Sequence, residues 1–517
     1  MKIFDKISIN QPRKSVFDLS HERKFSMNMG DLVPVLCQEV IPGDKFRINM
    51  EQLVRVMPLV APMMHRVNVY THFFFVPNRL VWNDWEKFIT GGEKGVDNPI
   101  FPTFDNGFSV TTLKAAPEFK YGSLFDYMGF PVKQLQDSTL TTEIPKLGFS
   151  QLPFRAYQLI YNEYYRDQNL ETKLDIPLTS GNLGWDSTNI RPILQLRKRA
   201  WEKDYFTSAL PYAQKGTQME LPLTGEALVR AQSDNKSVAL GNIVSGQDKA
   251  VTTGYTTSTG ALYADMENVS STTVNELRHA FQIQKWLERN ARGGTRYIEQ
   301  ILSHFGVKSS DARLQRPEYL GGGKTPVTIS EVLQMSSSDE TSPQGNMAGH
   351  GVSVGNSNQF SRYFEEHGMI IGIMSVIPRT AYMQGIPRYL LKTDRYDFYW
   401  PEFAHLGEQT VQSQELYWSP LSESYNKSDF GYQPRYTEYR YIPDTVHGEF
   451  LNTLKFWHMA REFASSPMLN SDFVKCQGDS LKRPFPVQDG SHKLYVQTYC
   501  NIKAIRPIPK YGNPGGI

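Results

Sequence analysis

The chain has 517 residues; 40% are hydrophobic, 21% are charged and 12% are aromatic, and 55 Lys and Arg residues stand against 53 Asp and Glu residues. This composition allows a sizeable core and excludes disorder throughout the chain. A net charge of +2 excludes a protein that coats nucleic acid by bulk charge alone, and no apolar run is long enough to predict a membrane span.

The N-terminus and the cysteines predict a reducing, intracellular location. Charged residues interrupt Met1–Ser8 every few positions, so the apolar stretch of a signal peptide is not expected. Cys37, Cys476 and Cys500 are few and odd in number, and no CxxC spacing occurs. The sequence therefore predicts free thiols and no structural zinc site.

Strands are predicted near both ends of the chain. Residues 33–37 form a short apolar run, and Pro and Gly within 41–44 predict a turn. Over 67–76, β-branched and aromatic residues occupy both alternation phases, which is typical of a strand packed on both faces. Later strands are predicted over 368–378, 436–441 and 493–499.

Helices are predicted in the middle of the chain. Apolar residues recur every three to four positions within 153–170, which indicates a short amphipathic helix. Residues 273–276 fit a capping box and predict a helix that ends at the glycine pair 293–294. A further short helix is expected over 297–305, before a glycine.

Residues 216–272 differ from the rest of the chain. They contain 14 Ser or Thr and six Gly, and Tyr255 and Tyr263 are their only aromatic residues. Such a segment buries little by itself. It is either a functional excursion from the main fold or a tolerated surface loop.

The order of these elements predicts an antiparallel β-sandwich with very long insertions between strands. Residues 396–457 include 16 aromatic side chains, more than one core needs. Surplus aromatic residues in Pro- and Gly-rich loops favour large, permanent interfaces.

Two motifs invite an enzymatic interpretation, and neither has the context that it requires. Gly351–Gly355 matches GxSxG, but polar loop sequence surrounds it where a nucleophile elbow needs a buried strand and a helix. Gly321–Thr325 resembles a phosphate loop, but Glu318 stands where that motif needs glycine. We expect no enzyme, no metal and no cofactor.

Both termini are mildly basic, with a net charge of +3 over 1–24 and again over 501–517. They are either solvated tails or segments that touch phosphates without reading sequence. The candidate nucleic-acid residues are Lys2, Lys6, Arg13, Lys14, Lys503, Arg506 and Lys510.

Several stretches, in the same order along most of the chain, resemble the major capsid protein of the Microviridae, small single-stranded DNA phages, and specifically its gokushovirus branch. They are Phe17–Lys24, Met29–Pro34, Pro42–Asp44, Arg55–Arg66, His72–Arg79, Glu276–Glu299, Arg316–Gly322, Pro343–Gly345 and Phe456–His458. Together these stretches are specific, although each alone is weak.

The resemblance implies a mainly β chain: a single eight-stranded antiparallel viral jelly roll with long inserted loops and a few short helices. It implies self-assembly, in the bacterial host cytoplasm, into a T=1 icosahedral virion shell around circular single-stranded DNA. The implied partners are other copies of the chain, the packaged DNA, a small basic DNA-binding protein, an internal scaffolding protein, a DNA pilot protein and a host surface receptor.

The resemblance also implies an insertion that forms protrusions at the threefold axes and contacts the host. We assign 1–202 and 273–517 to the jelly roll, the latter with a helical insertion, and 203–272 to the protrusion. The candidate attachment residues are Leu223, Val229, Val238, Ile243, Val251, Tyr255 and Tyr263.

A β-sandwich carbohydrate-binding protein or glycoside hydrolase is the alternative function. Surface aromatic residues suit both, but a hydrolase needs two carboxylates at a defined separation, and no pair stands out.

Overall fold

The computed structural model describes residues 14–105, 114, 116–135, 148–184, 191–216, 228–231, 262–265, 274–294, 296–308, 310–333, 335 and 347–511. The chain divides into two compact units, which are considered separately. One comprises Met1–Pro211 with Val307–Ile517, and the other comprises Tyr212–Gly306.

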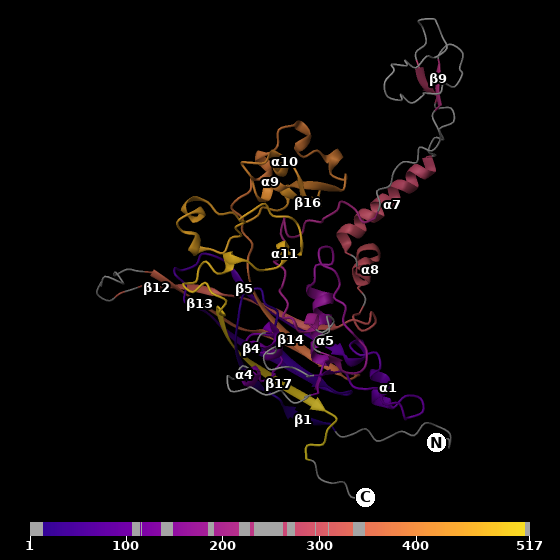
Figure 1. The fold of residues 1–517 in the computed structure, drawn as a ribbon, viewed down its shortest axis with the longest axis vertical. Helices are drawn as coiled ribbons and strands as arrows, with labels where there is room; N and C mark the ends of the chain where they lie inside the picture. Colours follow the sequence, from indigo (N-terminus) through magenta and orange to yellow (C-terminus); the bar gives the residue numbers. More distant parts are fainter. Residues whose placement is uncertain are drawn as a thin grey trace, which may run out of the picture. The chain divides into compact units, whose positions relative to one another are not determined.

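The first large sheet joins strands from opposite ends of the chain. Its order is β1-β17-β4-β13-β12, β2 pairs with β17 beyond the end of β1, and all neighbours are antiparallel. Figure 1 shows this as the yellow C-terminal strand β17 beside indigo N-terminal strands. The strands are β1 (Ser15–Asp18), β2 (His21–Met27), β4 (Lys45–Val56), β12 (Thr328–Leu333), β13 (Met347–Tyr363) and β17 (Leu494–Arg506).

The second large sheet is also antiparallel, in the order β11-β5-β14-β3. Its strands are β3 (Val33–Val40), β5 (Val67–Pro77), β11 (Glu318–Pro326) and β14 (Gly368–Pro378). The strands predicted over 33–37, 67–76 and 368–378 are thereby confirmed. The predicted turn is present as well, with Gly43 at φ 92° and the Asp44 amide donating to the Ile41 carbonyl.

One hydrophobic core lies between these two sheets. Side chains of β4, β13 and β17 from the first sheet share it with side chains of β5 and β14 from the second. Phe73 of β5 meets Phe360 of β13 with ring centroids 5.2 Å apart. The chain is therefore mainly β, with antiparallel sheets and a few short helices, as predicted.

The second sheet is covered on its other face as well. A second core cluster joins Phe74 and Ile371 of this sheet to helix α5 (Leu152–Ile160) and the short elements around it. Every residue of β14 is buried, as expected for a strand packed on both faces. The helix predicted within 153–170 is α5 continued by the π-helical turn η3 (Tyr161–Tyr165), and it ends at Arg166, whose backbone is extended.

Short elements connect these layers. The helices and 3-10 turns are η1 (Asn78–Leu80), α1 (Trp85–Thr90), η2 (Pro117–Phe119), α3 (Leu124–Tyr127), α4 (Val132–Leu135) and α6 (Arg191–Leu194). A small sheet contains β6 (Thr103–Asp105), β7 (Phe149–Ser150) and β8 (Leu183–Gly184), in which β6 and β8 are parallel.

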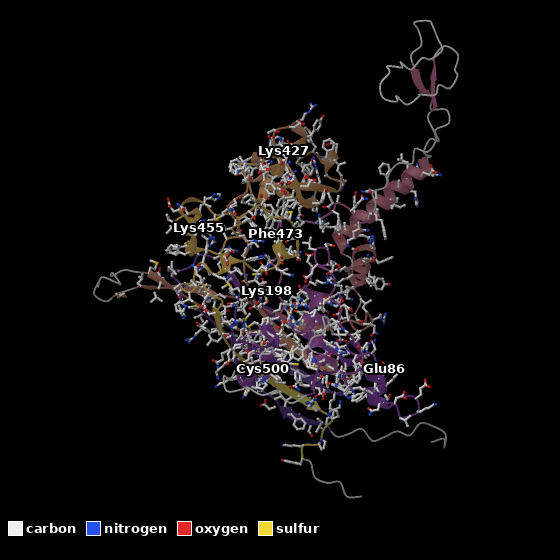
Figure 2. The ribbon with its side chains drawn as sticks, viewed as in Figure 1. Glu86, Lys198, Lys427, Lys455, Phe473 and Cys500 are labelled. Carbon is white, nitrogen blue, oxygen red and sulfur yellow. The ribbon has the colours of Figure 1, made fainter. Side chains whose placement is uncertain are left out.

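Residues 380–486, which we call the loop lobe, contain mostly irregular chain. A third cluster holds it together, in which Phe473, labelled in Figure 2, packs on Phe430 and Phe463. Its longer elements are β15 (Glu408–Gln412), α9 (Ser413–Leu416), α10 (Glu423–Asn426), β16 (Asp429–Pro434) and α11 (Ser471–Val474). Its 3-10 turns are η4 (Arg388–Leu390), η5 (Arg395–Asp397), η6 (Pro401–Phe403), η7 (Thr437–Tyr439), η8 (Gly448–Leu451), η9 (Lys455–Trp457) and η10 (Asp479–Leu481).

The strand predicted over 436–441 is wrong. Tyr436 has φ 65°, a left-handed conformation, and the 3-10 turn η7 follows it. The rings of Tyr436 and Tyr439 both pack against Tyr399, and the Tyr436 amide donates to the Gln409 side chain at 3.1 Å. Aromatic packing within the loop lobe therefore outweighs the strand propensity of this stretch.

The second unit contains two helices and a strand pair. The helices are α7 (Val274–Gly293) and α8 (Tyr297–Phe305), and the strands are β9 (Leu228–Ala231) and β10 (Leu262–Asp265). Both predicted helices are confirmed, and Gly306 closes α8 in the left-handed conformation. The predicted capping residue Thr273 lies outside the described residues.

Candidate nucleic-acid interface

Strand β4 exposes a row of charged side chains through simple alternation. Successive residues of a strand point to opposite faces of the sheet. In β4 this buries Phe46 and Ile48 against the core and exposes Lys45, Arg47 and Arg55 on the opposite side. The sequence therefore sorts charge onto one face of the first sheet.

Strand β17 adds aromatic rings to the same face. Tyr495, Tyr499 and Lys503 are four residues apart, so all three point away from the core. The tyrosines are 47% and 38% exposed. Such exposure leaves ring surface free to stack on a flat partner.

The strand register brings two of the cations together. Lys503 of β17 lies directly opposite Arg47 of β4, and both are exposed. Like charges in this arrangement repel, so the pair favours an anion bound between them. On its other side Lys503 lies opposite Asp18, whose pKa is lowered by hydrogen bonds from Ser20 and by the charge of Lys503.

Strand β13 and the residue before β1 extend the pattern. Tyr363 lies opposite Lys45 and is 50% exposed. The Lys14 ammonium lies 5.1 Å from the centroid of the Tyr363 ring and donates to the Gly43 carbonyl at 3.1 Å. A cation and an aromatic face therefore occupy one corner of the sheet.

We call this surface the basic sheet face. Its charged residues are the cations Lys14, Lys24, Lys45, Arg47, Arg55 and Lys503 and the acids Asp18, Glu22 and Glu51. Its exposed aromatic residues are Tyr363, Tyr495 and Tyr499. Cations interleaved with exposed rings can hold phosphates and stack bases without reading sequence.

The predicted nucleic-acid residues fall into four groups. Lys14 and Lys503 belong to the basic sheet face, and Lys510 is exposed beyond β17 with its ammonium 5.7 Å from the Tyr511 ring. Arg506 instead donates two hydrogen bonds, at 2.9 and 3.2 Å, to the fully buried carboxylate of Asp44. Lys2, Lys6 and Arg13 lie outside the described residues.

Sequence reasoning missed Arg47, Lys45, Arg55 and the tyrosines of β17. A signal was present, because 45–56 reads as strict alternation of polar and apolar residues over its first six positions. What the sequence could not supply was the register that sets Arg47 beside Lys503, since the two residues are far apart in the chain.

Of the predicted attachment residues, Val229 lies on β9 and Tyr263 on β10, in neighbouring antiparallel strands. Leu223, Val238, Ile243, Val251 and Tyr255 lie outside the described residues.

The two enzyme-like motifs have structural roles. Gly351–Gly355 lies inside strand β13, where the buried Ser353 hydroxyl donates to the Pro326 carbonyl at 2.8 Å. A Cβ on Gly351 would lie 2.7 Å from the Val56 side chain, so glycine allows close packing there. Lys324, from the other motif, lies in β11, and its ammonium pairs with Glu202 at 2.9 Å. Neither motif lies in the strand–turn–helix arrangement that the corresponding enzyme site needs.

Within the described residues, neither a metal centre nor a membrane-spanning helix is present. No group of three or more His, Cys, Asp or Glu side chains is arranged to hold a metal ion within this part of the chain. Among the helices in the described ranges, none is both long enough and apolar enough to cross a bilayer.

Comparison with known proteins gives consistent matches along the whole length. The family model described as Capsid protein (F protein) matches residues 6–516. The chain is 35% identical to Capsid protein VP1 of Chlamydia phage 1, with 99% of this chain and 97% of the relative covered. It is also 35% identical to VP1 of Bdellovibrio phage phiMH2K (97% and 95% covered) and 30% identical to VP1 of Spiroplasma virus 4 (98% and 96%).

Proposed function

Because the chain belongs to the Capsid protein (F protein) family, we propose that its copies close into a T=1 icosahedral shell around a circular single-stranded DNA genome. The chain is a major capsid protein, a structural virion component that self-assembles into a shell, and not an enzyme. The resemblance to the gokushovirus branch is confirmed by these relatives, and the carbohydrate-binding alternative is not favoured.

The two large sheets are, in this proposal, a single eight-stranded viral jelly roll. Four strands of each sheet form its body: β2-β17-β4-β13 in the first and β3-β14-β5-β11 in the second. Strands from the N-terminal and C-terminal halves alternate across both sheets. This alternation supports the assignment, because a jelly roll folds a long strand pair over into two Greek keys.

The basic sheet face lines the inner wall of the proposed shell and contacts the packaged DNA. The observation that carries this assignment is the register of Lys503 opposite Arg47, with Tyr499 on the same face. Two adjacent exposed cations bind phosphate oxygens, and the exposed rings stack bases of any sequence.

Other components supply what this chain lacks. A net charge of +2 cannot neutralise a packaged genome, so a small basic DNA-binding protein is proposed to provide the missing charge. An internal scaffolding protein and a DNA pilot protein complete the proposed set of partners, and assembly is proposed to occur in the host cytoplasm.

The insertion assigned to 203–272 is proposed to contact a host surface receptor through its part beyond Pro211, because Tyr205 and Phe206 are buried in the third core cluster. Support comes from the Ser- and Thr-rich composition of 216–272 and from the β9–β10 pair, in which Ala231 lies opposite Leu262. The chain thus leaves and re-enters this pair at adjacent positions. Replacing 232–261 by a short linker should give particles that form but no longer attach to host cells; full attachment would contradict the receptor role.

Expression of the chain, alone and with its scaffolding protein, tests the shell directly. Electron microscopy should show closed particles, and nuclease treatment should leave protected single-stranded DNA. The double variant Arg47→Gln/Lys503→Gln should form particles that protect several-fold less DNA, because two phosphate contacts are lost.

A charge-matched control separates local contact from net charge. Lys94→Gln/Lys308→Gln removes two exposed cations from outside the basic sheet face and should leave the protected DNA unchanged. Equal losses in both double variants would show that net charge, and not this face, holds the DNA.

A further inference from the structure

The loop lobe contains a cavity of about 430 Å³ that lies away from the basic sheet face. Residues 382–398 and 438–447 form most of its lining, and Tyr205, Phe206 and Glu415 complete it. The lining is mainly aromatic and aliphatic, which is typical of a site that accepts an apolar group.

One ion pair at this cavity is internally satisfied. The Arg388 guanidinium donates from Nη1 to Glu415 Oε1 at 2.7 Å and to the Thr410 carbonyl at 2.7 Å. The Tyr205 hydroxyl donates to the other carboxylate oxygen of Glu415 at 2.9 Å. Each charge therefore has its partner within the subunit.

A second ion pair is satisfied in the same way. Lys392 Nζ lies 3.2 Å from Glu438 Oε1 and 3.9 Å from the centroid of the Tyr439 ring. The Gln409 side chain donates to the other Glu438 oxygen at 2.7 Å. Since both cations are already neutralised, the cavity does not require a charged ligand.

The cavity opens onto exposed apolar side chains that also line it. Among these rim residues the exposed fractions are 71% for Tyr389, 52% for Phe398, 55% for Tyr439 and 83% for Ile442. Exposed apolar side chains that gather around one cavity, and are not scattered singly, are typical of an interaction surface. We call the cavity and these four residues the aromatic socket.

We propose that the aromatic socket receives an apolar group from a second copy of this chain in the shell. The proposal rests on the proposed shell formation, because closed rings of subunits use heterologous contacts, in which one surface of a subunit meets a different surface of the next. Its neutralised charges suit an apolar group. Its exposed rim extends the apolar surface beyond the cavity. A protein surface covers this extended area better than a small ligand does.

Cysteine labelling tests the proposal in assembled, DNA-free particles. In a Cys37→Ser background, Ile442→Cys should react with a small thiol reagent at least tenfold more slowly in particles than in free subunits. Lys503→Cys is the reference, because it reports how freely the reagent enters a DNA-free shell. Protection of position 442 well beyond that of position 503 supports the proposal, and equal protection at the two positions overturns it.

An assembly measurement provides a second readout. Ile442→Asp should raise the subunit concentration needed for assembly at least tenfold, because it sets a charge into the contact. Val96→Asp changes an apolar residue that is 77% exposed and does not line the socket, and it should raise that concentration less than twofold. Equal effects of the two variants would overturn the proposal.

Two other outcomes can be told apart, one that contradicts the aromatic socket proposal and one that contradicts the shell. A small molecule retained in the free subunit and seen by native mass spectrometry, with position 442 unprotected in particles, would mean a ligand site and overturn the proposal. Failure of the unaltered chain to form particles, even with its scaffolding protein, would contradict the shell itself.

Discussion

On the basic sheet face Arg47 and Lys503 are exposed, while Ile48 beside them is buried in the core. In the loop lobe Lys392 is buried in an ion pair, while Tyr389 is exposed. The sheet thus follows the ordinary sorting of polar from apolar residues, whereas the aromatic socket departs from it, although the loop lobe around the socket has its own buried cluster. Uncovered cations suit a polyanion and uncovered rings suit a protein surface, so the contrast separates two kinds of partner.

The largest expected effect comes from unbalancing a buried charge of the loop lobe. Burial raises the pKa of Glu415, but Arg388 holds it in an ion pair at 2.7 Å. Glu415→Gln leaves the guanidinium without its counter-charge, and we expect the free energy of unfolding to fall by about 3–5 kcal/mol. Urea denaturation of the unassembled subunit measures this change.

Two variants control this prediction. Lys427→Gln removes an exposed i,i+4 pair with Glu423, and it should leave the free energy of unfolding almost unchanged. The double variant Arg388→Met/Glu415→Gln should lose less than the two single variants combined, since neither charge remains unpaired. Strict additivity would contradict the coupling.

Acidification should lower the stability of the fold through two buried histidines, one on β5 and one beside Arg379. Burial lowers the pKa of His72, on β5, and of His65, whose Nε2 lies 2.6 Å from the Arg379 carbonyl, to about 4 in each case. Between pH 6.5 and about 4 the two histidines bind protons in the unfolded chain but stay neutral in the folded chain. Stability is therefore present above pH 6.5 and lost as the pH falls through this window, by at most about 3 kcal/mol for each histidine.

Unfolding measured at pH 7.5 and 4.5 for His65→Gln and His72→Gln checks this prediction. Each variant removes one titrating group, so its stability should change less between the two pH values than that of the unaltered chain. An unchanged difference in both variants would rule out these two residues as the source.

The contrast between the two regions also explains what the sequence could predict. The strand over 368–378 was predictable because its residues are apolar in both alternation phases, and it is buried on both faces. The false strand over 436–441 has similar propensity, but Tyr436 and Tyr439 pack on Tyr399 from another loop. The local sequence pattern predicts the structure correctly where the backbone hydrogen bonds of a sheet determine it. The pattern fails where contacts with side chains distant in the sequence determine it.

The same reasoning applies to the candidate site. Basic residues near the C-terminus were visible in the sequence, yet Lys503 is exposed while Arg506, three residues later, is bound to the buried Asp44. Nothing local distinguishes the two, because Asp44 is brought beside Arg506 only by the pairing of β17 with the N-terminal strands.

A moderate effect is expected from removing a ring of the basic sheet face. Tyr499→Ala should weaken binding of single-stranded DNA by about 1–3 kcal/mol through lost stacking, and Tyr499→Phe should retain most of the affinity. Tyr389→Ala, in the aromatic socket, is the matched control and should leave DNA affinity unchanged. Fluorescence titration with a labelled oligonucleotide measures all three, and equal losses at the two positions would remove the distinction between the surfaces.

The smallest effect distinguishes an exposed cation, Lys503, from Arg506, a partly buried cation that is paired with the buried Asp44. Lys503→Gln removes one phosphate contact, so the dependence of log affinity for single-stranded DNA on log salt should become shallower by about 0.7. Arg506→Gln should leave that slope unchanged, because its guanidinium is committed to Asp44 and releases no counterion on binding. Measurement of affinity across a salt series separates the two variants. Equal changes in slope would mean that Arg506 breaks its ion pair with Asp44 and contacts the DNA.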